Sequence, residues 1–296
     1  MHLVDPSMLG NNSNASFRAL EEGNILFFPR LPFDFSAEDR EALLAASQVA
    51  GAHHKNIAYR PKQDRVSNLG GADPALASRV HASLKNFSLA AIQFVGDLLP
   101  AYRSNWHVDY ASFRPLEEEG RDLPWKKRND LLHTDAFPTR PTNGDLILRF
   151  FTNINPVKSR VWITSEPFSK LAPRLAAEAG IERIAAGDGS PMKTVRRLSR
   201  FIGFPMTDRS PYDRFMLTFH DFLKKNQDYQ KGCTRFQFEF PPNSAWMAFT
   251  DIVPHAVLSG QYALEQTFIV ARNSLAFPEL APVSILENLA RKPLTI

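Results

Sequence analysis

The sequence contains very little cysteine and no long hydrophobic segment. Its one cysteine, Cys233, excludes an internal disulfide framework and is typical of a protein from a reducing compartment. No run of about 18 apolar residues is present, so the sequence predicts no membrane-spanning helix. The N-terminus also lacks the basic and then apolar pattern of a secretory signal peptide. Together these absences predict a cytoplasmic protein.

The sequence also lacks a strong charge of either sign. Lys and Arg number 35 against 31 Asp and Glu, which gives a formal net charge of +4 and a pI of about 9.2. This balance is too weak to indicate nucleic-acid binding, but it suits an anionic substrate or an anionic membrane surface. No low-complexity linker and no internal repeat divides the chain. We therefore expect a single domain over residues 1–296.

The first hundred residues predict mainly helices. Residues 51–72 are polar and glycine-rich and indicate a loop. Asp73-Pro74 is a typical helix start, and from there to Pro100 apolar side chains recur at a spacing of three or four residues. That spacing predicts one long helix with an apolar face. We expect residues 1–100 to form a helical buttress for the rest of the domain.

From about residue 101 the apolar period falls towards two, which is typical of strands. The candidate strands are Asp109–Arg114, Asp130–His133, Leu146–Ile154, Val161–Thr164, Arg235–Phe240, Ala245–Thr250, His255–Leu258 and Ala263–Ala271. A helical insert is expected at about residues 165–230 and a C-terminal tail at 276–296. The predicted fold class is α+β and mainly antiparallel. It is a double-stranded β-helix, or cupin-like jelly roll, over residues 101–275 that is buttressed by helices.

A metal site is indicated beside a loop rich in Pro, Thr, Asn and Gly. His133 and Asp135 are separated by one residue there, so in an extended backbone both side chains point to the same face. His255 is the candidate for a second imidazole. It would complete the two-His-one-carboxylate triad that is diagnostic of non-haem Fe(II) oxygenases. The pattern alone is weak, because His107-Val108-Asp109 also matches His-x-Asp.

Longer segments resemble one enzyme family. They are LLHTDAFPTRPTNGDLILRFFTNINP, SPYDRFMLTFHDFLKKN and FEFPPNSAWMAFTDIVPHAVLSGQYALEQTF. They are similar to the Kdo hydroxylases, Fe(II)- and 2-oxoglutarate-dependent dioxygenases that act on 3-deoxy-D-manno-oct-2-ulosonic acid (Kdo) in bacterial lipopolysaccharide. The resemblance implies that His133, Asp135 and His255 are the metal ligands and catalytic residues, with O2 as co-substrate. It also implies that His107-Val108-Asp109 is a chance match.

The resemblance further implies a substrate and a place of action. The expected reaction is hydroxylation of Kdo, at C3, in the glycolipid Kdo-lipid A. Because Kdo is added to lipid A on the cytoplasmic side of the inner membrane, we expect a cytoplasmic protein that contacts that membrane peripherally. The basic clusters Lys126-Lys127-Arg128 and Arg196-Arg197 are either solvated surface or part of an attraction to anionic lipid.

2-Oxoglutarate needs a cation for its distal carboxylate, and a guanidinium holds a buried carboxylate through paired hydrogen bonds. Many relatives in the broader superfamily carry that cation shortly after the distal His, where this chain has none. Arg149, in a strand, and Arg272, after the last strand, are therefore the two candidates. Gln266 and Thr267 are candidates for supporting hydrogen bonds. The alternative for Arg149 is a solvent-facing position on an amphipathic strand.

The sequence offers several candidates for substrate binding and leaves other functions open. Arg114, Arg140 and Arg160 would bind a sugar carboxylate or a lipid phosphate, and Trp162 would stack on the substrate. The alternatives are surface arginines and a core aromatic. A 2-oxoglutarate-dependent hydroxylase of another small molecule or of a protein stays open. So do a cupin-like metal-dependent sugar isomerase or lyase, and a non-catalytic carbohydrate- or lipid-binding roll.

Overall fold

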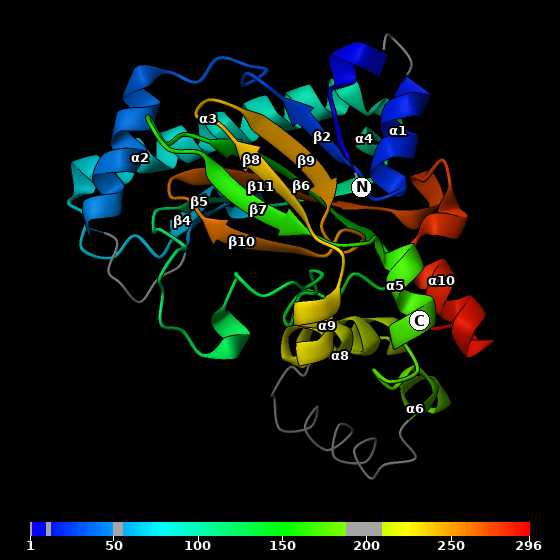
Figure 1. Ribbon diagram of the computed structural model, residues 1–296. Helices are drawn as coiled ribbons and strands as arrows, with labels where there is room; N and C mark the ends of the chain where they lie inside the picture. Colours follow the sequence, from blue (N-terminus) through cyan, green and yellow to red (C-terminus); the bar gives the residue numbers. More distant parts are fainter. Residues whose placement is uncertain (1, 10–12, 50–55, 188–208) are drawn as a thin grey trace, which may run out of the picture.

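In the computed structural model, residues 2–9, 13–49, 56–187 and 209–296 are described. A three-stranded sheet lies over a large sheet, and helices cover the far face of the large sheet (Figure 1). Side chains from both sheets, among them Phe151, Trp162 and Trp246, form one aromatic cluster between them. The α+β, mainly antiparallel jelly-roll class predicted from the sequence is confirmed.

The large sheet has eight strands in the order β1-β2-β9-β6-β11-β5-β3-β4, and the small sheet has the order β10-β7-β8. The strands of the large sheet, in that order, are Leu3–Val4, Ile25–Phe28, Ala245–Phe249, Leu146–Asn153, Ala263–Val270, Trp106–Arg114, Ile57–Arg60 and Arg65–Ser67. Those of the small sheet are His255–Ser259, Arg160–Thr164 and Phe236–Phe240. Within the described residues every pairing is antiparallel except the short parallel pair of β1 and β2.

The long helix α3 (Pro74–Leu98) follows its predicted bounds. The Asp73 side chain accepts a hydrogen bond from the backbone N–H of Leu76 and so caps the first turn. The middle of its apolar face is buried, and Phe87 and Phe94 pack against Phe150 of the large sheet. Burial of that face on the sheet is what holds this helix. The other helices of this region are α1 (Ser13–Glu21), α2 (Ala37–Val49) and α4 (Pro100–Arg103).

The expected loop at residues 51–72 contains a hairpin instead, and that part of the prediction is wrong. Strand β3 pairs with β5, so that Ile57 lies opposite Phe113 and Tyr59 lies opposite Ala111. Strand β4 closes the edge, and Asp64 (φ 45°) makes the turn between the two strands. The strands are too short to show a period-two pattern, and the pairing of β3 with β5 supplies the missing stabilisation.

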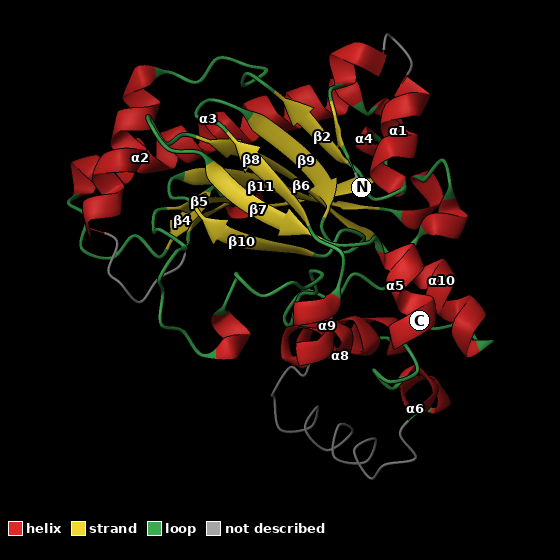
Figure 2. Cartoon of the chain, in the orientation of Figure 1, coloured by secondary structure: helices red, strands yellow, loops and turns green. Residues whose placement is uncertain are grey.

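The helical insert packs at one end of the roll (Figure 2). It contains α5 (Phe168–Leu175), α6 (Ile181–Ala186), α8 (Pro211–Lys225) and α9 (Gln227–Gly232), and the C-terminal helix α10 (Pro282–Ala290) lies beside α5. Short 3-10 turns lie at Pro6–Leu9, Pro61–Gln63, Trp125–Lys127, Arg272–Ser274 and Pro278–Leu280. The basic pair Arg196-Arg197 lies outside the described residues. Among the described helices none has the length and apolar character needed to cross a bilayer.

Candidate metal and cofactor site

The structure brings His133, Asp135 and His255 together at the mouth of the roll. The segment predicted as a strand at Asp130–His133 makes just one bridge, in which His133 and His255 exchange backbone hydrogen bonds of 3.1 and 2.9 Å. The backbone N–H of Asp135 donates to the carbonyl of Thr250 at 2.9 Å. One ligand atom from each of the three side chains lies within 4.8 Å of the others. This is the one group of potential metal ligands found among the described residues.

The backbone also fixes the tautomer of both imidazoles. His133 donates from Nδ1 to the carbonyl of Leu131 at 2.7 Å, and His255 donates from Nδ1 to the carbonyl of Val253 at 2.9 Å. With the proton held on Nδ1, the Nε2 atom of each ring carries the lone pair. The His133 Nε2 atom is 4.0 Å from Asp135 Oδ1. Two Nε2 atoms and a carboxylate oxygen therefore converge on one point.

The three groups also have the protonation states that a metal requires. Burial, followed by the neighbouring His255, lowers the pKa of His133 well below its usual value, and burial likewise lowers the pKa of His255. Burial on its own would raise the pKa of Asp135, but Arg149 and the two imidazoles outweigh it, so this pKa lies below its usual value. Near neutral pH the site consists of two neutral imidazoles and one carboxylate, as metal coordination demands.

Arg149 is buried on the inner face of β6 and connects the triad to a chain of ion pairs. Its Nε atom is 3.0 Å from Asp135 Oδ2, and its Nη1 atom donates to Glu265 at 3.1 Å. Arg114 donates to the same Glu265 oxygen from two nitrogens, at 3.0 and 2.6 Å. The Arg149–Asp135 pair is not aligned as a hydrogen bond, so Asp135 Oδ2 and Arg149 Nε have no hydrogen-bond partner among the described residues. A buried polar atom without a partner is costly. A bound cation would satisfy the Asp135 oxygen, and a bound anion would satisfy the Arg149 nitrogen.

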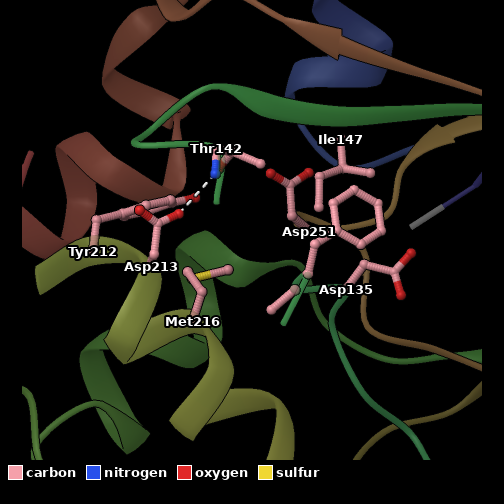
Figure 3. Close-up of a pocket in the computed structure, with 9 residues that line it drawn as sticks. Asp135, Thr142, Ile147, Tyr212, Asp213, Met216 and Asp251 are labelled. Atoms are coloured by element: carbon pink, nitrogen blue, oxygen red, sulfur yellow. Dashed lines mark hydrogen bonds between the residues drawn. The ribbon is translucent and has the colours of Figure 1, made fainter. Parts of the chain in front are cut away.

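A second buried carboxylate, that of Asp251, lies behind the triad. It lines a small cavity of about 10 Å³ together with Asp135, Tyr212 and Met216 (Figure 3). In Figure 3 the carboxyl groups of Asp135 and Asp251 point in different directions. Neither carboxyl oxygen of Asp251 has a hydrogen-bond partner among the described residues, and burial raises its pKa to about 7. Among the described residues, Asp251 does not belong to the group of potential metal ligands.

Helix α8 adds two residues that the sequence interpretation missed. His220 packs edge-on against His133 at 4.8 Å between ring centroids and donates from Nδ1 to the carbonyl of Thr134. Lys224, one turn further on, is buried, and its ammonium donates to the carbonyl of Lys126. Burial lowers the pKa of Lys224. The signal in the sequence was their i, i+4 spacing, which places both on one helix face.

The chain matches the family model for 3-deoxy-D-manno-oct-2-ulosonic acid (Kdo) hydroxylase over residues 4–293. It belongs to the Kdo hydroxylase family. Solved structures of the Kdo hydroxylase KdoO, a non-haem Fe(II)- and α-ketoglutarate-dependent dioxygenase, are similar throughout. The complex with α-ketoglutarate and Fe(III) is 36% identical, with 96% of this chain and 91% of KdoO covered and a TM-score of 0.83. The cobalt(II) complex is 36% identical, with the same coverage and a TM-score of 0.84. A search of curated proteins found no match.

Two of the cofactor-binding predictions are corrected by the structure. Arg272 is exposed in the 3-10 turn after β11, where it contacts Asp145 and Thr295 rather than the interior of the roll. Gln266 is fully buried on the face of β11 that packs on α3, because its amide bonds to Ser88 of that helix. Neither residue faces the site. Thr267 lies directly opposite Arg149 in the β6–β11 pairing, on the inner face.

The candidate substrate residues of a Kdo hydroxylase fall into different environments. Arg140 pairs with Asp109 and lies over the ring of Phe137, two residues after Asp135. Arg114 is occupied by Glu265.

Two further candidates are buried. Arg160 is fully buried and donates to the carbonyl of Gly260 at 2.8 Å. An added Cβ at Gly260 would meet the Arg160 backbone at 2.8 Å, so this close approach requires glycine. Trp162 lies in the core between the sheets, where it stacks on the His255 ring at 5.0 Å. This position matches the alternative interpretation of Trp162 as a core aromatic.

Proposed function

We propose that the chain is a single Fe(II)- and 2-oxoglutarate-dependent dioxygenase domain that hydroxylates Kdo at C3 in Kdo-lipid A. The observation that carries the proposal is the meeting of His133, Asp135 and His255 with both imidazole Nε2 atoms available. Family membership over nearly the whole chain supports the substrate class. The donor set, two nitrogens and one oxygen, fits the facial arrangement that leaves open positions on Fe(II).

In the proposed reaction His133, Asp135 and His255 would hold the iron, and Arg149 with Thr267 would hold the distal carboxylate of 2-oxoglutarate. When bound, iron and 2-oxoglutarate would supply the oxidative chemistry. O2 would oxidise 2-oxoglutarate to succinate and CO2, and a sugar C–H bond to an alcohol. Trp162 supports the His255 ring from its side of the core, and the backbone carbonyls fix the imidazole tautomers. The protein's part is to orient the groups and keep water from them.

Arg149 is the best remaining anchor, because it is the buried cation that contacts a triad residue. Its two carboxylate neighbours, Asp135 and Glu265, keep it charged: burial on its own would lower its pKa, but these carboxylates raise the pKa above its usual value. Glu265 is in turn held by Arg114, so the position of the guanidinium is fixed from two sides. A fixed guanidinium is the form in which arginine binds a carboxylate most strongly.

We also propose cytoplasmic action with peripheral contact to the inner membrane. The supporting feature is a surface cluster around the indole of Trp125, where the ammonium groups of Lys126 and Lys225 lie 5.4 and 4.3 Å from the ring centroid. Lys224 on the same helix bonds to the carbonyl of Lys126, so the cluster lies against the α8 side of the metal site. Arg128 is paired with Asp130 and contributes less.

The test is an assay with Fe(II), 2-oxoglutarate and Kdo-lipid A in which the glycolipid mass and succinate are both measured. The expected result is one added oxygen per glycolipid with one succinate formed. The matched control is His255→Ala, which should show neither the added oxygen nor succinate. It should also bind Co(II) more weakly by more than about 100-fold, because one of the three metal ligands is removed. A product of unchanged mass without succinate would instead support an isomerase, and metal-independent binding would support a non-catalytic roll.

A further inference from the structure

A second pocket opens on the surface beside the metal site. It lies between the turn of the β3–β4 hairpin and the first half of β5, and its volume is about 180 Å³. Its walls are Arg60, Pro61, Lys62, Gln63, His107, Val108, Asp109, Tyr110 and Arg140. His107 and Asp109 belong to the second His-x-Asp motif of the sequence, which takes no part in the metal triad.

The charges in this pocket are unbalanced. Arg60, Lys62 and Arg140 face one carboxylate, that of Asp109, which leaves a formal charge of +2 with His107 neutral. Asp109 is already paired with Arg140. In the described part of the chain neither Arg60 nor Lys62 has an ion-pair partner, and the Nε atom of Arg60 is buried without a hydrogen bond. A cation at a pocket wall that has no ion-pair partner is a ready binding group for an anion from outside.

An aromatic ring holds two of these cations in place. The guanidinium carbons of Arg60 and Arg140 lie 5.1 and 4.2 Å from the centroid of the Tyr110 ring. Two guanidinium groups near one ring repel each other, and a bound anion near both would relieve that repulsion. Gln63 and His107 add neutral donors at the rim.

The pocket is connected to the metal site through a single side chain. The Phe137 ring has the guanidinium of Arg140 at 4.3 Å on the pocket side and that of Arg149 at 5.4 Å on the metal side. Arg149 in turn contacts the metal ligand Asp135. The pocket and the metal site are therefore neighbours that share one aromatic ring between their arginines.

We propose that this pocket binds an oxyanion of the phosphate monoester class that belongs to the same glycolipid substrate. The inference rests on the proposed function for the identity of the substrate. The charge of the pocket, the absence of an ion-pair partner for Arg60 and the contact with Arg149 through Phe137 do not depend on that function. Arg60 and Lys62 would hold the phosphate, Gln63 and His107 would donate to it, and Arg140 would connect the phosphate site to the reacting sugar.

The first experiment measures binding alone. Inorganic phosphate is titrated calorimetrically into EDTA-treated wild type, the double variant Arg60→Gln/Lys62→Gln and a control double variant Arg65→Gln/Lys170→Gln. The control removes the same charge at exposed positions, one of them on the same hairpin. The pocket variant should lose affinity by at least about ten-fold, because two charge-assisted contacts are removed, while the control stays within about two-fold of wild type. Equal affinities in the two doubles would overturn the inference, and thermal unfolding checks that both variants fold.

The second experiment identifies the source of the phosphate. KM is measured for Kdo-lipid A and for its dephosphorylated form by succinate release. In the pocket variant the KM for the phosphorylated glycolipid should rise by about ten-fold, with no comparable rise for the dephosphorylated one. An unchanged KM for both would overturn the glycolipid as the source. If wild type releases no succinate with either substrate, the proposed function fails, and the phosphate titration alone decides whether the pocket is an oxyanion site.

Discussion

At the scale of single residues, the metal site depends on what each side chain does with its second polar atom. His133 and His255 both use Nδ1 on a backbone carbonyl two residues earlier, so each ring has one orientation and one tautomer. Asp135 uses one carboxyl oxygen towards the imidazoles and has Arg149 beside the other. These contacts hold the three ligand atoms close together.

Arg149→Ala should raise the KM for 2-oxoglutarate by at least about ten-fold, because a buried guanidinium that would pair with the cofactor carboxylate is removed. Arg149→Lys should recover part of the affinity, since the lysine ammonium keeps the charge but cannot form the paired hydrogen bonds of a guanidinium. The same alanine variant should lose about 3–5 kcal/mol of stability, because Glu265 and Asp135 lose their common partner. KM is measured by succinate release, with the exposed Arg272→Ala as control. A wild-type KM for 2-oxoglutarate in Arg149→Ala would contradict the proposal that Arg149 binds the cofactor.

The buried carboxyl of Asp251 leads to a prediction about how stability depends on pH. Its pKa is about 7 in the folded protein against 3.8 when unfolded, so the folded state holds the proton more tightly. Its contribution to stability is therefore largest below about pH 4, falls as the pH rises and is lost above about pH 7. Asp251→Asn carries no such charge. The free energy of unfolding of the variant minus that of wild type should rise with pH over this range, by up to about 4 kcal/mol.

The Asp251 measurement is urea unfolding of EDTA-treated protein at several pH values from 4 to 8. Taking the difference between variant and wild type cancels the titration of the other groups they share. A difference that does not change with pH would show that the buried carboxyl is not responsible.

At the scale of elements, helix α8 and the loop after the metal motif are joined by one carboxylate. Asp213 accepts hydrogen bonds from Ser210 at the helix start, in a capping box. It also accepts from the backbone N–H groups of Thr142 and Asn143, at 2.8 and 3.1 Å. The helix that carries His220 is thereby fixed to the loop that follows Asp135.

Asp213→Ala should lower the free energy of unfolding by roughly 2–4 kcal/mol, because it removes the cap and leaves two loop N–H groups without an acceptor. Ser210→Ala is the matched control. It removes the capping hydroxyl and keeps the loop contacts, and it should cost about 1 kcal/mol. Urea unfolding measures both. Equal losses would mean that the contacts from Asp213 to the loop contribute nothing.

At the scale of the whole molecule, charge is distributed so that opposite signs meet inside and positive charge remains at two surfaces. Arg149, Glu265 and Arg114 are paired in the interior of the roll. Among the described residues, the pocket around Arg60 and the cluster around Trp125 carry positive charge at the surface. An anionic ligand would be attracted to both.

Activity on Kdo-lipid A in anionic vesicles should fall steeply as salt is raised, because each basic residue near the surface contributes about 1 kcal/mol that salt screens. Activity on a soluble Kdo glycoside should fall much less. Succinate release from both substrates over a series of ionic strengths measures the difference. If the activities on the two substrates fell in parallel with salt, the proposed membrane contact would be wrong, and the proposed hydroxylase function would not be affected.

The sequence by itself determined the features that depend on local geometry. The His133-x-Asp135 pair shares one face because an extended backbone alternates, and α3 follows from its apolar spacing and its Asp73 cap. The longer motifs indicated His255 as the third metal ligand and showed the resemblance to the Kdo hydroxylase family.

The tertiary structure decided the features that depend on which side of an element is covered. Period-two alternation shows that two residues share a face, but it does not show which face is inward. Gln266 and Thr267 are neighbours in β11, and packing on α3 alone turns Gln266 outward and leaves Thr267 opposite Arg149. The pocket at Arg60 likewise exists because β5 pairs with a hairpin that is too short to be recognised in the sequence.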